Sequence, residues 1–111
     1  MQSENFIFNS EANWETVGEG MRRQILGYDD QIMLVKIEFK AGGIGYVHQH
    51  VHRQCSYVVS GVFEFQVGKE TKIVKAGDGL YVETNVLHGV KCLEEGVLID
   101  TFSPVREDFL T

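Results

Sequence analysis

Short apolar segments separated by polar turns most strongly constrain how this chain folds. Turn signals rich in Gly, Asp, Asn and Glu recur about every ten residues, and no long stretch carries the apolar stripe of an amphipathic helix. The segments between the turns are rich in Val, Ile, Phe and Tyr, which favour strands. Besides a histidine-bearing strand after residue 43, the pattern predicts strands over residues 31–39, 55–60, 62–67, 71–75, 80–83, 88–93 and 97–103.

The predicted fold class is all-β. Alternation is clearest over residues 31–39, where the apolar side holds Met33, Val35, Ile37 and Phe39. Many short strands suggest a sandwich or small barrel, because near closure leaves few exposed edges. Turns are predicted at residues 60–61 and 94–96. At the end of the chain, Ser103 at an N-cap and Pro104 at the first helical position predict one helical turn.

Composition and charge predict an ordinary globular protein and exclude two classes of partner. Residues 1–111 are expected to form one domain, with 43% hydrophobic and 23% charged residues. The net charge of −6 argues against binding of nucleic acid. No apolar run approaches the roughly 18 residues of a membrane helix, and no secretory signal opens the chain, so we expect a cytoplasmic protein. In that compartment Cys55 and Cys92 are expected to be free buried thiols rather than a disulfide.

Spaced histidines predict a metal site. His48 and His50 are two residues apart, so on a strand both imidazoles project from one face. Gln54 follows after three further residues, and His88 lies downstream of a glycine-containing turn. Imidazole nitrogen and amide oxygen suit nickel, zinc, iron or manganese, and affinity alone does not choose among these ions. We predict that one divalent transition metal is bound by His48, His50, Gln54 and His88.

Other interpretations of the histidines fit the spacing less well. A register that starts at His50 and His52 would place Ser56, a poor metal ligand, at the amide position. A helical zinc-protease motif needs Glu directly after the first histidine, where this chain has Gln49. The remaining alternative is a set of exposed loop histidines with no shared partner. His52 receives no role.

The same residues carry a resemblance to the cupin family. The first cupin motif runs Gly, five residues, His-X-His, three or four residues, Glu, six residues, Gly. This chain matches it with Gly42, His48, His50, Gln54 and Gly61, with Gln in place of the usual Glu. The resemblance implies a single-domain, double-stranded β-helix, also called a jelly-roll barrel.

The second cupin motif is degenerate in this chain. Gly77 aligns with its first glycine and His88 with its metal-binding histidine. The usual proline, glycine and asparagine of the motif are replaced by Glu83, Asn85 and Cys92. Glu83, in the place of a turn-forming proline, leaves the particular substrate open more than the metal.

A closer resemblance is to the pectin-degradation cupins of the KdgF type, small proteins that act on unsaturated uronate monosaccharides. The C-terminal string over residues 98–110 carries it, together with residues 57–61 and Trp14. The resemblance implies that the metal is held by His48, His50, Gln54 and His88, and that turnover involves Asp100, Phe102 and Arg106. Arg53 departs from the Glu of many relatives and leaves the particular substrate open.

The expected function is metal-dependent conversion of a 4,5-unsaturated uronate, released from pectin or alginate, to its linear keto form. Asp100 would move the proton, Arg106 would hold the carboxylate, and Phe102 would form an apolar wall. Structural alternatives are a turn anchored by Asp100 and a surface pair of Arg106 with Glu107 or Asp108. The alternative functions are an oxygen-dependent dioxygenase and a sugar-binding cupin without turnover.

Two further expectations concern surfaces. Cupins with exposed strand edges often pair, so we expect a homodimer. Three tyrosines are expected to pack in the core rather than line the cavity: Tyr46, Tyr57 and Tyr81.

Overall fold

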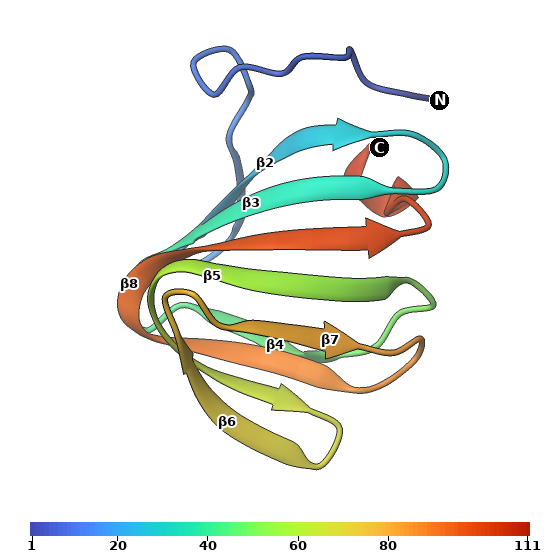
Figure 1. The fold of residues 1–111 in the computed structure, drawn as a ribbon. Coiled ribbons are helices and arrows are strands. Elements are labelled where there is room, and N and C mark those ends of the chain that lie inside the picture. The colour runs from blue at the N-terminus through green and yellow to red at the C-terminus, as the bar shows by residue number, and fades with distance from the viewer.

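The computed structural model describes residues 1–111, and its regular structure is strand apart from one short 3-10 helix (Figure 1). The strands are β1 (Glu15–Gly18), β2 (Met21–Tyr28), β3 (Met33–Phe39), β4 (Ile44–His48), β5 (Arg53–Val67), β6 (Glu70–Lys75), β7 (Gly79–Val82) and β8 (His88–Ser103). The 3-10 helix is η1 (Glu107–Phe109). The all-β prediction is therefore confirmed.

Two long strands, β5 and β8, pair antiparallel and belong to both layers of the fold. The first half of β5 and the second half of β8 lie in one layer, in which β7 pairs with β5 and β3 pairs with β8. The second half of β5 and the first half of β8 lie in the second layer, in which β6 pairs with β5 and β4 pairs with β8. Strands β2 and β1 extend the first layer beyond β3. Figure 1 shows β5 and β8 bending together at one end of the molecule, which is how a jelly roll closes.

Two turns predicted from the sequence are wrong, because the chain bends there within continuous strands. Residues 60–61 and 94–96 do not end strands, because β5 and β8 run through them with shifts of register. Gly61 has a φ of +85°, a conformation that L side chains rarely adopt. A Cβ atom on Gly96 would overlap the carbonyl oxygen of Ser60. The glycines that looked like turn signals allow two strands to cross closely while they bend.

Strands β1 and β2 were not predicted. The alternation of β2 is obscured because Arg23 lies opposite Ile37 on the inward face, where an apolar residue is usual. On the outward face, Gln24 is fully buried, since its amide donates hydrogen bonds to the carbonyl oxygens of Asn9 and Ala12. The N-terminal segment thus covers a polar residue that would otherwise be exposed.

Two apolar clusters form the core. The larger contains Phe39, Val58, Phe63, Phe65, Cys92 and Leu98. The smaller contains Met33, Val35, Phe102 and Val105, so it connects the inward face of β3 to the chain after β8. The predicted alternation of residues 33–39 is confirmed by this burial. Both cysteines are free, but only Cys92 is buried, and Cys55 is exposed on β5.

The end of the chain differs in detail from its prediction. One helical turn is present, but it is the 3-10 helix η1, and Arg106 rather than Ser103 precedes it. Ser103 is the last residue of β8 and is joined to Pro104 by a cis peptide bond. None of the helical structure is long and apolar enough to cross a membrane.

Candidate metal centre and its cavity

Three histidines converge where the two layers meet. His48 ends β4 and pairs in register with His88, the first residue of β8, while His50 lies in the loop after β4. One ring nitrogen from each of the three can be chosen so that all lie within 4.8 Å of one another. The expectation that both His48 and His50 lie on a strand is wrong, but their convergence is as predicted. Three imidazoles at this spacing could hold one metal ion.

Each of these imidazoles is oriented by a main-chain carbonyl. Nδ1 of His48 lies 2.8 Å from the oxygen of Tyr46, and Nδ1 of His50 lies 2.8 Å from the oxygen of His52. Nδ1 of His88 lies 2.9 Å from the oxygen of Val86. A carbonyl oxygen only accepts, so the neutral rings carry their proton on Nδ1 and present a lone pair at Nε2. This tautomer is the one a metal ligand needs.

The neutral form is favoured where the rings are buried. Burial lowers the pKa of His88 from 6.5 to about 4 and, to a smaller extent, the pKa of His50. The charge of Arg106 lowers both pKa values further. Nε2 of His88 is closed off from water and has no hydrogen-bond partner within the chain. A buried lone pair without a donor is a cost that a bound cation would remove.

A buried polar chain connects the histidines to a carboxyl group. Ser56 on β5 lies directly opposite Asp100 on β8, and its hydroxyl donates a 2.6 Å hydrogen bond to Oδ1 of Asp100. The Ser56 oxygen therefore accepts from the amide of Gln54, at 3.0 Å. This fixes the side-chain oxygen of Gln54 toward Nε2 of His50, 3.1 Å away.

The contact between Gln54 and His50 brings two acceptors together. With Nδ1 of His50 donating to a carbonyl, its Nε2 offers a lone pair to the amide oxygen of Gln54, which offers another. Two facing lone pairs repel unless a proton or a cation lies near both. The chemistry of this donor set fits a metal bound by the three histidines, with the Gln54 oxygen beside it.

Asp100 is the buried acid of the site. It lies on the inward face of β8 together with Phe102, as the sequence predicted. Burial raises the pKa of Asp100 to about 6, against the opposing effects of the Ser56 hydrogen bond and the Arg106 charge. The carboxyl is therefore mainly ionised at neutral pH but gains a proton easily, which suits a group that accepts and returns one.

A cavity of about 280 Å³ lies beside the histidines. It is lined by two of them, His48 and His88, and by every other predicted site residue except His50: Gln54, Asp100, Phe102 and Arg106. Arg106 also forms the pair with Asp108 that was the structural alternative to substrate contact, through hydrogen bonds of 3.1 and 2.9 Å. The volume is near the lower end of the roughly 300–1,000 Å³ of small-molecule sites. A cavity of this size can hold a small molecule beside the histidines.

Sequence reasoning gave no site role to several residues of this cavity, and Arg23 and Phe109 are the two that matter most for its chemistry. Arg23 of β2 and Phe109 of η1 both line it. Their guanidinium and ring are stacked, with Cζ of Arg23 3.7 Å from the ring centroid. Arg23 was hidden because its strand was not recognised, although its place between Met21 and Ile25 follows a period of two.

His52 lies outside the metal cluster. Its ring centroid is 5.4 Å from that of His50, but the three-histidine cluster does not include it. Its carbonyl oxygen, rather than its imidazole, contacts the site, as the acceptor for His50. Ser56 likewise is no ligand candidate, and orients Gln54 and Asp100.

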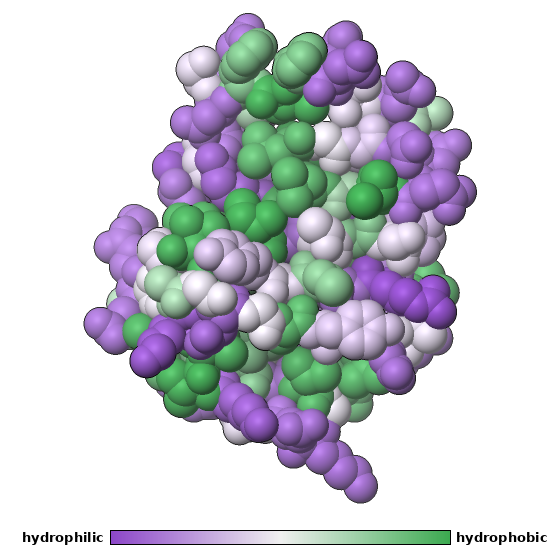
Figure 2. All heavy atoms as spheres, viewed as in Figure 1, coloured by the Kyte–Doolittle hydropathy of each residue, from purple (hydrophilic) through white to green (hydrophobic).

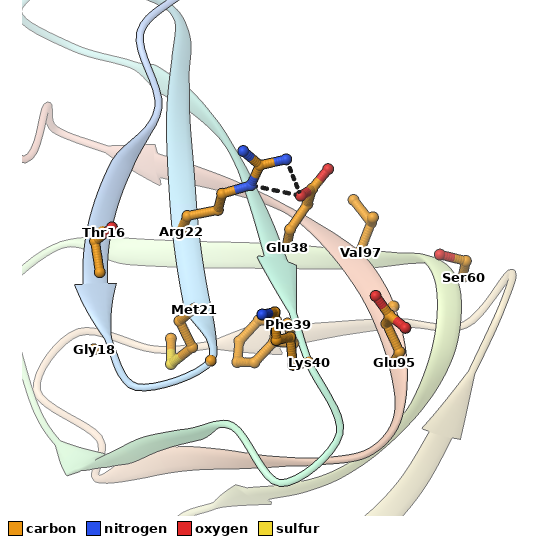
Figure 3. A pocket seen from close by; sticks show the side chains of 12 residues that line it. Thr16, Gly18, Met21, Arg22, Glu38, Phe39, Lys40, Ser60, Glu95 and Val97 are labelled. Carbon is orange, nitrogen blue, oxygen red and sulfur yellow. Dashed lines mark hydrogen bonds and ion pairs between the residues drawn. The ribbon is translucent and has the colours of Figure 1, made fainter.

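A larger hollow of about 640 Å³ lies elsewhere, and Figure 3 shows it from close by. Its polar lining includes Arg22, Glu38, Lys40 and Glu95. Arg22 is already paired with Glu38 at 2.7 Å, and both side chains are exposed to solvent. The hollow is lined by no histidine, and none of its side chains has a polar atom that is both buried and without a partner. The chemistry of the molecule is concentrated in the smaller cavity.

Residues 35–102 match the family model of the cupin domain, and the chain belongs to the cupin family. Among its relatives is the pectin degradation protein KdgF of Dickeya dadantii (strain 3937). The two are 45% identical over 107 residues, which cover 95% of this chain and 97% of the relative. The resemblance to pectin-degradation cupins noted in the sequence is confirmed.

Solved structures agree with the fold. A RmlC-like cupin from Shewanella frigidimarina NCIMB 400 is 49% identical and superposes with a TM-score of 0.95 over 97% of each chain. KdgF from Halomonas sp. is 35% identical, with a TM-score of 0.91 over 96% of this chain and 99% of its own. The single-domain jelly-roll prediction is confirmed by these neighbours.

Proposed function

We propose that this protein converts a 4,5-unsaturated uronate monosaccharide, released from pectin or alginate, to its linear keto form. The observation that carries the proposal is one small cavity that joins a three-histidine cluster to the buried carboxyl of Asp100 and the guanidinium of Arg106. The relationship to KdgF of Dickeya dadantii, a protein named for pectin degradation, supports the choice of substrate.

The metal ligands that we propose are His48, His50, His88 and the side-chain oxygen of Gln54. All four are neutral, so a bound nickel, zinc, iron or manganese ion would act as a Lewis acid on substrate oxygens. The Ser56 hydroxyl keeps Gln54 in the orientation that this requires.

The reaction is an isomerisation in which every atom of the substrate is kept. The anomeric hydroxyl loses its proton, the bond between the anomeric carbon and the ring oxygen breaks, and an aldehyde and an enolate result. The double-bond carbon next to the oxygen-bearing carbon then takes up a proton, and the enolate oxygen becomes the oxygen of a ketone. We assign both proton transfers to Asp100, whose pKa of about 6 allows it to accept and return a proton near neutrality.

Arg106 and Phe102 position the sugar in this scheme. The positive charge of Arg106 acts on Asp100 and on the histidines, so a carboxylate held by Arg106 lies beside the reacting groups. Phe102 is buried, and its ring centroid is 5.8 Å from that of His50. It offers an apolar wall next to the metal ligands.

The test is an NMR assay that follows loss of the unsaturated uronate. Protein loaded separately with nickel, zinc, iron or manganese is compared with protein treated with a chelator. We expect conversion to the linear keto sugar with at least one ion and little with the chelated protein. A loaded protein no faster than buffer, across several such sugars, would show that the proposal is wrong. Oxygen uptake would instead indicate a dioxygenase, and binding without conversion a sugar-binding cupin.

We also propose that the protein is a homodimer that pairs through the outer apolar face of its first layer. We define this face as Leu34, Cys55, Tyr57, Val59, Tyr81, Ile99 and Thr101, which strand pairing places side by side. Figure 2 shows hydrophobic residues interspersed with hydrophilic ones over one side of the molecule. Lys36, opposite Ile99, and Glu38, opposite Val97, border this face with one charge of each sign, so two copies can meet there despite the net charge of −6.

The tyrosines on this face were expected in the core, and that expectation is wrong. Tyr57 and Tyr81 are each 51% exposed, and Tyr46 on β4 is 78% exposed. Side chains of β5 alternate between the core and solvent, and Tyr57 falls on the outward side between the buried Ser56 and Val58. A large aromatic residue on an open sheet face is what an interface between copies would bury.

Substitution of Tyr57 by lysine is expected to convert the dimer to a monomer, because it places a desolvated charge at the centre of each half of the contact. Size-exclusion chromatography with light scattering measures the change. Ile73→Lys is the matched control, since Ile73 is 56% exposed on β6 of the other layer. A monomeric wild type, or equal effects of both substitutions, would contradict the proposed interface.

The cytoplasmic location stays a prediction.

A further inference from the structure

Arg23 is a charged residue on the inward face of β2, and only part of its hydrogen-bonding capacity is used within the chain. It lies directly opposite Ile37, in the row of β2 that also holds Met21 and Ile25. Its side chain is only 16% exposed. Charged groups are rarely buried unless they are fully paired, so this arginine needs an explanation beyond packing.

The pairing of Arg23 within the chain is incomplete. One nitrogen, Nη2, donates to Glu15 at 3.3 Å, and Glu15 is itself 42% exposed. Nε is closed off from water and has no hydrogen-bond partner. Arg106 differs, because two of its nitrogens bind the Asp108 carboxylate at 3.1 and 2.9 Å. Of the two arginines in the cavity, Arg23 has more of its charge and hydrogen-bonding capacity uncompensated.

The two arginines enclose the ring of Phe109. The Cζ atoms of Arg23 and Arg106 lie 3.7 and 4.2 Å from its centroid. Two guanidinium groups at these distances do not fit over one face of a ring, so they cover opposite faces. Phe109 thus separates two positive groups, both of which line the cavity.

The charge of the cavity contrasts with that of the molecule. Its charged lining residues are Arg23, Arg106 and Asp100, whereas the whole chain has a net charge of −6. Arg106 is paired with Asp108 through two hydrogen bonds, whereas Arg23 is only partly paired with Glu15, so Arg23 keeps the larger capacity for an added anion. A guanidinium near a low-dielectric wall attracts an anion more than a neutral ligand.

We propose that Arg23 is a specificity-determining residue, whose guanidinium binds the carboxylate of a sugar acid from the side of Phe109 opposite Arg106. The inference rests on the proposed function and deepens it, because it assigns the preference for a uronate over a neutral sugar to a named residue. The alternative is a structural role in which Arg23 only ties Glu15 and Phe109 to β2.

The test measures binding of two sugars that differ only at one carbon, galacturonate and galactose, to metal-loaded protein by calorimetry. For Arg23→Gln we expect galacturonate to bind about 10- to 100-fold more weakly, the loss of one hydrogen bond to a charged group. Binding of galactose is expected to stay unchanged. Arg23→Lys keeps the charge but not the planar fork, and is expected to lie between wild type and Arg23→Gln.

The control is Arg22→Gln, the neighbouring residue on the outward face. Arg22 pairs with Glu38 over the other hollow (Figure 3) and stacks on Trp14 at 3.9 Å, away from the cavity. We expect no change in the binding of either sugar. Thermal unfolding of every variant identifies loss of fold, and Arg23→Met, which suits the apolar neighbours Met21 and Ile25, replaces Arg23→Gln if that variant is unstable.

The outcomes separate this inference from the proposed function. If a folded Arg23→Gln variant binds both sugars equally more weakly, or still prefers galacturonate as wild type does, the proposed role of Arg23 is wrong. The proposed function still stands in that case if the wild type converts the unsaturated uronate. An Arg23-dependent preference in a wild type that converts no unsaturated uronate supports the inference and contradicts the function. A wild type that does not prefer galacturonate over galactose would overturn the inference directly.

Discussion

Replacing Asp100 with asparagine is expected to lower turnover by about 100- to 10,000-fold, the usual contribution of a positioned acid or base. Asparagine keeps the shape of the side chain and an oxygen that can accept from Ser56, but it cannot carry the proton. The metal content should be unchanged, because Asp100 contacts the ligand set only through Ser56 and Gln54. The NMR assay and elemental analysis on one preparation measure both effects.

The same substitution is expected to stabilise the metal-free protein at neutral pH. Burial raises the pKa of Asp100 from 3.8 to about 6, so the folded state holds this proton more tightly than the unfolded chain does. That contribution to stability is complete below pH 3.8 and is lost as the pH rises through about 6. This pKa difference corresponds to a loss of about 3 kcal/mol in the free energy of unfolding at neutral pH. Asparagine does not ionise, so the variant does not suffer this loss.

Urea unfolding of chelated wild type and Asp100→Asn measures this gain. The variant should be the more stable at neutral pH, and the two curves should approach each other near pH 3.8, the ordinary pKa of the carboxyl. Glu64→Gln is a matched control, because it removes a carboxylate from the exposed face of β5. An Asp100→Asn protein that turns over normally, or that is less stable at neutral pH, contradicts the role given to this buried acid.

Replacing His88 with alanine is expected to abolish stable metal binding. His88 is 2% exposed, and its unpartnered Nε2 is the most enclosed of the three ligand atoms. Loss of a group that merely supports a ligand costs about 10- to 100-fold in metal affinity, so loss of a ligand should cost more than about 100-fold. Elemental analysis after dialysis measures the retained ion, and thermal unfolding with and without metal measures the linked stabilisation.

His52→Ala is the control for this experiment. His52 stands beside His50 but lies outside the cluster, and its contact with the site is through its main chain. The variant should retain the ion. If His52→Ala loses the metal and His88→Ala keeps it, the chosen register of histidines is incorrect.

The sequence predicted the centre of the site better than its surroundings. The convergence of His48 and His88 follows from motif spacing, because strand pairing in a cupin brings the two motifs together. The orientation of Gln54 did not follow, since it depends on a serine whose partner is 44 residues away. Ser56 was considered only as a ligand and rejected, which is correct, but its role in orienting two neighbours needs coordinates.

The fold, like the site, was predicted correctly where local sequence patterns decide the structure and wrongly where contacts between distant residues decide it. The alternation of residues 33–39 was recognised because its inward side chains pack on apolar partners. β2 was missed because Arg23 faces the cavity and Gln24 is covered by the N-terminal segment, so neither obeys the usual pattern. The turns predicted at Gly61 and Gly96 were wrong for a related reason, since their glycines permit a close crossing of strands rather than an end. Local patterns fail where tertiary contacts decide the residue type.

The carbonyl oxygens that orient His48, His50 and His88 belong to the backbone and not to side chains. No amino-acid substitution removes such an acceptor as long as the strand ends keep their course. The wall residues of the cavity are therefore free to change while the imidazoles keep their tautomer. Evolution or an engineer can retune what this pocket accepts without having to rebuild the ion-binding chemistry beneath it.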